Sequence, residues 1–412
     1  MADERVEIDA DRLRETFERY SAIGATEDGG LHRLALTDED REVRDALVSD
    51  LDALGVDVRI DELGNVFGRR EGTDPDAEPV LIGSHLDSQP YGGRYDGQLG
   101  VLAALETLRA LDDATVETRR PIELVNWTNE EGSRFQTPML GSGVATGQLD
   151  REEMLALSDD DGDTIAAELE RIGYDGDDPV SLGERHAYLE LHVEQGPTLD
   201  RTGNAVGIVE GVFGMAWLEV TIHGESDHAG PTPMDARSDA LATAVDAIGA
   251  IEALPGHLAP DAVTTVGRID VEPDSINVIP DEVTFTVDVR SYDDDVVTAG
   301  IERIESEIAH ACARRGTASE LAELWRIPPI EFSTRVREAV TDAVADLGVS
   351  AQSIVSGAGH DAKYVNDVAD AGMIFVPSVD GKTHNEAEFT RWDDVVAGTR
   401  VFARATRSLA NG

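Results

Sequence analysis

The stretch that decides the fold is Pro79–Gly100, which reads PVLIGSHLDSQPYGGRYDGQLG. Its first five residues have the apolar content of a buried strand, its middle is rich in glycine, and a helix is expected over Gly97–Leu111. The apolar run PIELVNW follows that helix. A strand, a helix and a second buried strand in this order predict an α/β fold with a mostly parallel central sheet flanked by helices.

Further elements extend the pattern on both sides of this stretch. Two helices are expected near the start of the chain, at Asp11–Tyr20 and after Thr37, where TDED resembles a capping box. The stretches VDVRI and GNVFGRR look like paired strands, and YLEL looks like another strand. After the pair Pro328 and Pro329 the pattern resumes, and it ends in an amphipathic helix near Trp392–Leu409.

The segment between these two parts has a different order of strands and helices. It carries the expected strands MAWLEVTIHG, AVTTVGRID and EVTFTVDVR, and helices near Arg237–Ala253 and Val297–Arg314. These elements predict a compact α+β unit of ordinary domain size. We therefore expect a discontinuous catalytic domain, residues 1–212 and 329–412, with an inserted α+β domain at residues 213–328.

The charge of the chain is extreme. It has 83 acidic and 34 basic residues, a formal net charge of −49, and only two lysines, Lys363 and Lys382. A surface with acids spread through every segment stays hydrated in concentrated salt, where charge repulsion is screened within a few ångströms. We therefore expect that the protein comes from the cytoplasm of a halophile. The alternative, an acidic protein that binds a basic partner, would favour a block or tail of acids.

Several classes of protein are excluded or disfavoured by composition. A single cysteine, Cys312, allows no internal disulfide and no cluster of sulfur ligands. The start MADERVEID lacks a basic, apolar signal, and no stretch approaches 18 uninterrupted apolar residues, so we expect neither secretion nor a membrane span. The acidic surface also disfavours nucleic acid as a ligand.

Histidines and carboxylates collect where the predicted strands end. His85 follows PVLIG, and Asp96 lies in the glycine-rich loop before the helix. His192 closes YLEL, the paired Glu130 and Glu131 follow PIELVNW, and His384 lies in a loop before the last helix. Ligands bind at the carboxyl ends of strands in open α/β sheets. Asp87, two residues beyond His85, could hold its imidazole from behind.

These nitrogen and oxygen ligands suit zinc, manganese, cobalt or nickel, and a bridging carboxylate could hold two ions. The alternative is a satisfied polar core. It is disfavoured because too many acids at strand ends would lack basic partners.

A family resemblance rests on seven motifs: GSHLDSQPYGGRYDG, TNEEGSRF, ELHVEQGP, SDHAGPTPM, SINVIP, SGAGHDA and THNE. Together they resemble the N-carbamoyl-L-amino-acid hydrolase, β-ureidopropionase and allantoate amidohydrolase family, which belongs to the dinuclear metallopeptidase clan. The resemblance runs from about His85 to Glu388, with no departure at a ligand position.

The resemblance implies a role for each of these residues. One divalent metal ion would take His85 and His192, the other Glu131 and His384, and Asp96 would bridge both. Zinc is the usual metal of the family. Glu130 would be the general base in hydrolysis of the ureido C–N bond of N-carbamoyl-L-amino acids or allantoate-like ureides, with release of ammonia and carbon dioxide.

The resemblance also assigns residues that bind substrate. In the inserted domain, a lid and dimerisation domain by the resemblance, His228 would stabilise the oxyanion across the interface of a homodimer. Asn277 and Arg290 would bind the substrate carboxylate; the alternative for Arg290 is a surface ion pair with Asp288. The remaining pocket residues are Gln195, which would orient the ureido group, and Gly359 and His360.

Two other functions remain open from the sequence. An aminopeptidase or N-acyl-amino-acid hydrolase could use the same dinuclear scaffold, and a metal-free binding protein could keep the fold. Neither the ureide nor the native metal is fixed by the sequence.

The paired glutamates raise a question of their own. Adjacent like charges repel and raise each other's pKa unless cations lie nearby. If strand geometry persisted to Glu131, neighbouring side chains would point in opposite directions and could differ in role. The resemblance gives the direction: Glu131 towards the metal and Glu130 towards the attacking water.

Overall fold

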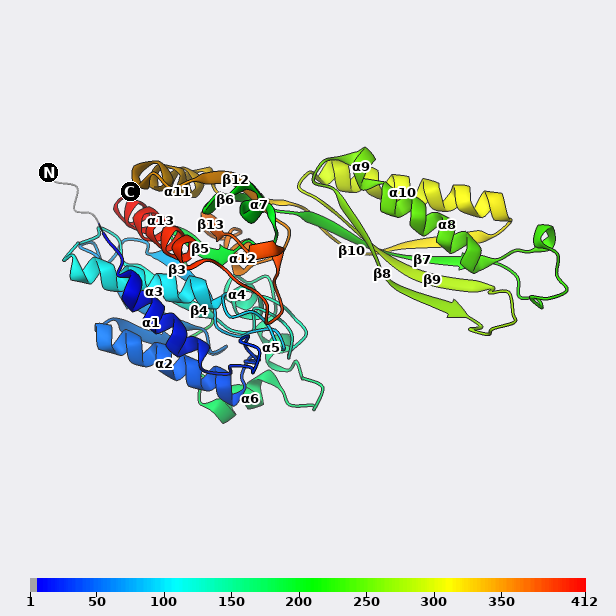
Figure 1. The fold of residues 1–412 in the computed structure, drawn as a ribbon. Coiled ribbons are helices and arrows are strands. Elements are labelled where there is room, and N and C mark those ends of the chain that lie inside the picture. Colours follow the sequence, from blue (N-terminus) through cyan, green and yellow to red (C-terminus); the bar gives the residue numbers. More distant parts are fainter. Residues whose placement is uncertain (1–5) are drawn as a thin grey trace. The chain divides into compact units, whose positions relative to one another are not determined.

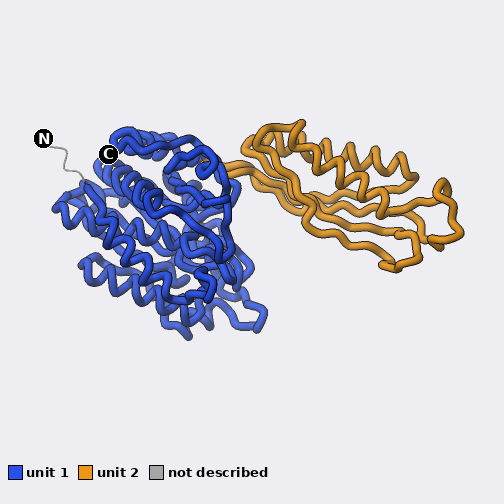
Figure 2. The backbone as a smooth tube through the Cα atoms, in the orientation of Figure 1, with its two compact units in different colours: residues 1–210, 332–412 blue, residues 211–331 orange. Residues whose placement is uncertain are grey.

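The computed structural model describes residues 6–412, so the first five residues of MADERVEID lie outside it. The chain forms two compact units (Figure 2). Unit 1 comprises the described residues up to 210 together with residues 332–412, and unit 2 comprises residues 211–331. The segment expected as an insertion, residues 213–328, lies within unit 2.

Unit 1 is built on a mixed sheet of nine strands (Figure 1). Its middle strands β4, β3, β5 and β13 are parallel to one another, whereas the strands on either side join antiparallel. The predicted α/β fold with a mainly parallel central sheet is therefore confirmed. The path across the sheet is β1 (Asp57–Ile60), β2 (Val66–Arg70), β4 (Ile122–Trp127), β3 (Val80–His85), β5 (Ala187–Val193), β13 (Ala371–Val376), β6 (Val206–Val212) and β11 (Ile330–Glu331), with β12 (Ala351–Ser356) also on β6.

The four parallel strands form because their residues can be buried on both faces. Every residue of β3, β4, β5 and β13 is buried. Strands of this kind appear in the sequence as continuous apolar runs rather than as alternating patterns. This is why PVLIG, PIELVNW and YLEL could be recognised as strands.

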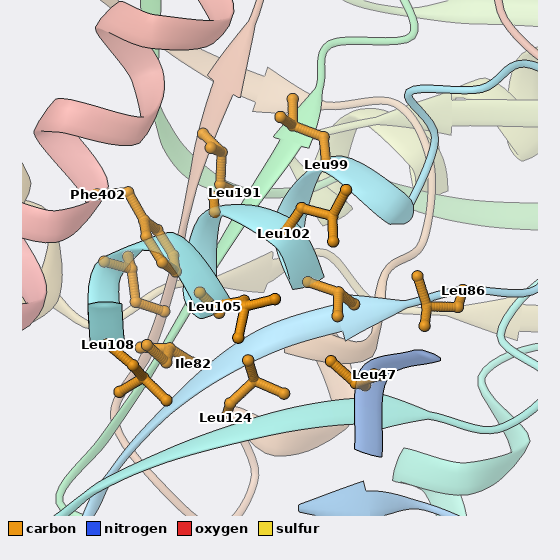
Figure 3. Packing of buried hydrophobic residues seen from close by; sticks show 14 of the residues in the cluster. Leu47, Ile82, Leu86, Leu99, Leu102, Leu105, Leu108, Leu124, Leu191 and Phe402 are labelled. Carbon is orange, nitrogen blue, oxygen red and sulfur yellow. The ribbon is translucent and has the colours of Figure 1, made fainter. Parts of the chain in front are cut away.

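Helix α3 (Gln98–Asp113) supplies much of the core above the sheet (Figure 3). It packs against β3 and β5 and against α13 (Trp392–Asn411). Burial of one leucine side chain contributes roughly 1.5–3 kcal/mol. The buried cluster includes Leu99, Leu102, Leu105 and Leu108 of α3 with Ile82, Leu124, Leu191 and Phe402.

The other helices of unit 1 are shorter or lie towards the ends of the chain. The expected cap at Thr37 is present, because its hydroxyl accepts a hydrogen bond from the amide of Asp40, and α2 ends at Gly55 in the left-handed conformation. The set comprises α1 (Ala10–Ser21), α2 (Asp38–Leu54), α4 (Leu140–Ala145), α5 (Arg151–Leu155), α6 (Ile165–Ile172), α7 (Thr198–Thr202), α11 (Thr334–Leu347), α12 (Asp361–Val365) and the 3-10 helix η2 (Val379–Gly381).

Unit 2 is a four-stranded antiparallel sheet with two long helices on one face (Figure 1). The strand order is β10 (Ala318–Ile327), β7 (Gly214–His223), β9 (Glu282–Ser291) and β8 (Val263–Glu272). Helices α8 (Ala240–Ala253) and α10 (Asp294–Arg315) bury the apolar face. The shorter helices are η1 (Met234–Ala236) and α9 (Pro255–Leu258).

Strand β9 alternates as its sequence predicts. Val283, Phe285, Val287 and Val289 are buried, whereas Asp288 and Arg290 lie on the opposite, partly exposed face. The segment β10 was not expected as a strand. Among residues 6–412, no helix is both long and apolar enough to cross a lipid bilayer.

Candidate metal centre and active site

The candidate ligands meet at one edge of the parallel strands. His85 is the last residue of β3 and pairs with Trp127, the last residue of β4. His192 lies one residue before the end of the parallel strand β5. Since the carboxyl ends of parallel strands share an edge, the two histidines and the loop after β4 are brought together.

Asp96 lies at the centre of this group. Its Oδ1 atom is 3.1 Å from His192 Nε2 and 3.7 Å from His85 Nε2. Its Oδ2 atom is 3.5 Å from His384 Nε2, which is also 3.6 Å from Glu131 Oε2. The two oxygens of one carboxylate thus face two separate sets of side chains, each compact enough to hold a metal ion.

The glycine after Asp96 makes this arrangement possible. Gly97 has φ +62°, and a Cβ atom at this position would lie 2.3 Å from His85 Cε1. A side chain would therefore be strained and would collide with the imidazole. The DG pair at the start of α3 lets Asp96 approach both histidines.

The histidine tautomers fit a bound cation. His85 Nδ1 lies 3.0 Å from the main-chain carbonyl of Asp87, and His192 Nδ1 lies 3.0 Å from that of Val193. A carbonyl can only accept, so each Nδ1 carries a proton, and in His85, whose ring is neutral, Nε2 presents a lone pair. His85 Nε2 is buried and has no hydrogen-bond partner within residues 6–412. Lone pairs and carboxylates that face one another match the donor set of a divalent metal ion.

The pKa values of the buried groups also fit a site that binds divalent cations. Burial lowers the pKa of His85 to about 4, so its imidazole is neutral. Burial and then the Asp361 carboxylate raise the pKa of Glu130 well above its usual range, and burial and then Asp96 do so for Glu131. Cations held between these acids would offset both the burial and the repulsion that raise the two pKa values.

His192 and Asp96 form a closely interacting pair. Burial alone would lower the pKa of His192, but the neighbouring Asp96 carboxylate raises it to about 9. Burial likewise opposes ionisation of Asp96, and the charge of His192 outweighs it, holding the pKa of Asp96 below its usual range. A negative Asp96 at the centre of the group suits a carboxylate shared by two cations.

The side chains of Glu130 and Glu131 point to different neighbours because of the loop after β4, and not because of alternation along a strand. Strand β4 ends at Trp127, and Asn129 adopts a left-handed conformation with φ +54°. The condition that strand geometry persists to Glu131 is therefore not met. Glu130 Oε2 lies 3.4 Å from His85 Nε2, whereas the Glu131 carboxylate lies beside His384.

Two side chains from the segment after β3 hold these glutamates. The Asp87 carboxylate accepts hydrogen bonds of 3.2 Å from the amides of both Glu130 and Glu131. Gln89 donates to both oxygens of the Glu131 carboxylate, from its main-chain amide at 3.1 Å and its side-chain amide at 2.8 Å. Asp87 thus supports His85 through its carbonyl and the glutamates through its carboxylate, which lies 3.8 Å from His85 Nδ1.

Gln195 reaches into the same group of side chains. Its side-chain amide donates to Asp96 Oδ2 at 2.8 Å and lies 3.3 Å from His384 Nε2. Gln195 and His384 both have positive φ, 58° and 52°. Non-glycine residues in this conformation cost free energy and cluster at functional sites.

His360 lies against the ligand cluster, and Gly359 adjoins it in sequence. The His360 ring is 4.4 Å from the His192 ring, centroid to centroid, and its Nε2 atom is 3.1 Å from the Ser356 hydroxyl. Gly359 lies beside Met139, because a Cβ atom there would be 3.3 Å from Met139 Cε. The structure therefore brings His360 to the cluster of candidate metal ligands.

Comparison with known proteins assigns the family. The pattern of peptidase family M20/M25/M40 matches residues 81–408. The chain belongs to this family. The N-carbamoyl-L-amino-acid amidohydrolase of Rhizobium meliloti is 40% identical over 403 residues, which cover 98% of this chain and 97% of that protein. The allantoate amidohydrolase of Bacillus subtilis is 33% identical, with 97% of each chain covered.

A solved structure extends the likeness to three dimensions. An amidase of the hydantoinase/carbamoylase family from Burkholderia multivorans is 44% identical, covers 99% of each chain and gives a TM-score of 0.94. The resemblance that the seven motifs indicated is therefore confirmed for this M20/M25/M40 chain.

Three residues expected at the site of this M20/M25/M40 chain belong to unit 2. His228 and Asn277 lie on adjacent segments, where the amide of Ala229 donates to the carbonyl of Asn277 at 2.9 Å. Both side chains are exposed. Arg290 lies near the end of β9 and donates to Asp288, with a closest distance of 2.7 Å. The ion pair considered as the alternative for Arg290 is therefore present.

Three further residues contact this group and were not expected there from the sequence: Gln89, Glu190 and Glu388. Glu190 is fully buried on β5 and accepts hydrogen bonds from the Ser84 hydroxyl, the Tyr188 hydroxyl and the amide of Ala362. Its signal was a charged residue inside the apolar run YLELHV. Because its oxygens are already hydrogen-bonded, Glu190 fits a supporting role beneath His192 better than that of a ligand.

Proposed function

We propose that this chain is a metal-dependent amidohydrolase that cleaves the ureido C–N bond of N-carbamoyl-L-amino acids or allantoate-like ureides. The observation that carries the proposal is the position of Asp96, whose two oxygens face His85 and His192 on one side and His384 and Glu131 on the other. Glu130 lies beside this group. The names of the relatives support the ureide as substrate class.

The proposed metal ligands follow from the two sets of side chains. His85 and His192 would hold one divalent ion, Glu131 and His384 the other, and Asp96 would lie between them. Zinc is the expected metal, with manganese, nickel and cobalt as alternatives for the same donor atoms. When bound, the pair of cations supplies Lewis-acid activation of a water molecule and of the ureido carbonyl.

Glu130 would move the proton. One oxygen of its carboxylate accepts the proton of the attacking water and delivers it to the departing nitrogen of the amino acid. The other product, carbamate, decomposes to carbon dioxide and ammonia. Burial of Glu130 suits this role, since a raised pKa brings a carboxylate nearer to the range in which it both accepts and returns a proton.

Substrate binding would use both units. Gln195, Gly359 and His360 would orient the ureido group in unit 1. Arg290 in unit 2 would bind the substrate carboxylate with its forked guanidinium. Its bond to Asp288 is no obstacle, because a partly exposed ion pair contributes only about 0–1 kcal/mol and can be exchanged.

The spacing within unit 2 supports a homodimer. His228 and Asn277 lie beyond the Glu282 end of β9, since the amide of Gly224 bonds to Asp281 and the amide of Ile279 bonds to Asp227. Arg290 lies eight residues beyond Glu282 on this strand. At about 3.4 Å per residue, the distance between Glu282 and Arg290 is roughly 27 Å. One small substrate cannot reach both ends of the unit. His228 and Asn277 would therefore serve the second subunit, with unit 2 as lid and dimerisation domain.

A substrate panel tests this function. We expect ammonia release from N-carbamoyl-L-amino acids or allantoate, and at least about a hundredfold lower kcat/KM on dipeptides and N-acyl amino acids, because the polar groups placed for the ureido nitrogen would be left unpaired. Ammonia and free amine are both measured on the same enzyme preparation. Amine release from dipeptides without ammonia from any ureide would instead establish the aminopeptidase or acylase reading.

The charge of −49 carries a second proposal, adaptation to concentrated salt. We expect the midpoint of thermal unfolding to rise between about 0.1 M and 3 M potassium chloride, as the screening length falls from about 10 Å to below 3 Å. The expected rise of the midpoint is larger than roughly 2–4 °C, the shift that corresponds to about 1 kcal/mol in the free energy of unfolding. Sucrose, which favours burial without screening charge, is the control. An equal rise in both solutes would contradict the proposal.

A further inference from the structure

One buried carboxylate near the metal site has no role in the proposed reaction. Glu388 lies four residues after His384 and is only 5% exposed. Its Oε1 atom accepts two hydrogen bonds, from the amide of Tyr95 at 3.0 Å and from the amide of Asp96 at 3.1 Å. These contacts join segments that are 292 and 293 residues apart in the sequence.

The two segments are those that carry separate ligands. The loop before α3 carries Asp96, and the loop before α13 carries His384. Glu388 therefore connects the main chain of Asp96, the proposed shared ligand, to the loop that carries His384. Two hydrogen bonds from successive main-chain amides to one oxygen atom fix both the position and the direction of this main chain.

The loop before α3 is shaped to admit this carboxylate. A Cβ atom on Gly93 would lie 2.1 Å from both Glu388 Cδ and Oε1. Any side chain at residue 93 would therefore displace the carboxylate. This contact gives a physical reason for the second glycine of YGGRYDG.

We propose that Glu388 is a positioning residue that fixes Asp96 relative to His384, so that Asp96 can serve two metal ions. The inference rests on the ligand set of the proposed function. Asp96 must keep Oδ1 near His192 and Oδ2 near His384 at the same time. A small rotation of its main chain would lose one of the two contacts. Loss of an outer hydrogen-bond partner of this kind typically costs 10–100-fold in metal affinity.

The test compares Glu388→Ala with Glu388→Gln in the full-length protein. Glu388→Ala is expected to weaken zinc binding about 10–100-fold in a chelator competition, while Glu388→Gln, which keeps an acceptor oxygen, stays within about threefold of the wild type. Gly93→Ala should reproduce the defect of Glu388→Ala by displacing the carboxylate. Glu386→Ala is the matched control, since it removes an acid of the same loop whose side chain makes no hydrogen bond within residues 6–412.

Hydrogen exchange of the metal-free protein gives a readout that does not depend on the ligand set. The amides of Tyr95 and Asp96 should exchange faster in Glu388→Ala than in the wild type, with the rest of unit 1 unchanged. Equal exchange in the two proteins would overturn the positioning role. An equal defect of the Gln and Ala variants would overturn it too, because charge and not the acceptor would then be responsible. Absence of zinc binding by the wild type, together with the expected exchange, would refute the ligand set alone.

Discussion

Substitution Glu130→Gln is expected to lower kcat by roughly 10²–10⁴-fold, the range that general acid and base catalysis contributes, while two metal ions per chain are retained. The amide has nearly the same shape but cannot take up the proton of the attacking water. It also stays on the His85 side of the cluster, where Glu130 Oε2 lies 3.4 Å from His85 Nε2. The measurement pairs steady-state kinetics on the best ureide with elemental analysis of the purified protein.

Glu131→Gln is the matched control, one residue further along the same loop. Its carboxylate lies 3.6 Å from His384 and is bound by Gln89, so its loss is expected to weaken metal binding as well as turnover. Equal metal retention in the two variants would contradict the division of roles. Less than one ion per chain in the wild type would instead favour a metal-free binding protein.

His228→Ala is expected to reduce kcat by about 10²–10³-fold, as loss of one oxyanion donor does, and to be rescued by a second inactive variant. If His228 serves the partner subunit, a mixed dimer of His228→Ala and Glu130→Gln contains one intact site. Random exchange of subunits in a two-fold dimer then restores about a quarter of the wild-type activity. The measurement is activity before and after the two proteins are exchanged.

The control for this experiment mixes Glu130→Gln with Glu131→Gln. Both changes lie in unit 1, so every mixed dimer keeps a defective metal or base in each site and no activity returns. Failure of His228→Ala and Glu130→Gln to complement, in dimers shown to have exchanged, would place His228 in the site of its own chain. The length of β9 between Glu282 and Arg290 argues against that outcome.

The parts of the fold that the sequence predicts are those determined by local burial. β3, β4 and β5 are mostly apolar and are buried over their whole length, and the alternation in β9 assigns each side chain to a face. Strand β10 reads ASELAELWRI and is exposed at most positions. It is the edge strand of the four-stranded sheet, next to β7, and is held by main-chain hydrogen bonds, for which its side chains give little signal.

The site was predictable as a set of residues but not as a set of contacts. Strand ends bring His85 and His192 to one edge because parallel strands share it. The orientation of Glu130 and Glu131 depends on Asp87 and Gln89, more than 40 residues earlier, and on the left-handed Asn129. No local pattern encodes such long-range contacts. The direction of the division of roles came from the family resemblance and remains a prediction.

The pairing of β6 with β11 has a consequence for how this protein can change. Ile330 lies opposite Val212, so the chain leaves and returns at neighbouring points, and everything between them is, in topology, the loop of one hairpin. The entropy of closing a loop rises by only about 0.6 kcal/mol for each doubling of its length. Evolution could therefore lengthen, trim or replace that loop for a new substrate at almost no expense to the sheet edge beneath it.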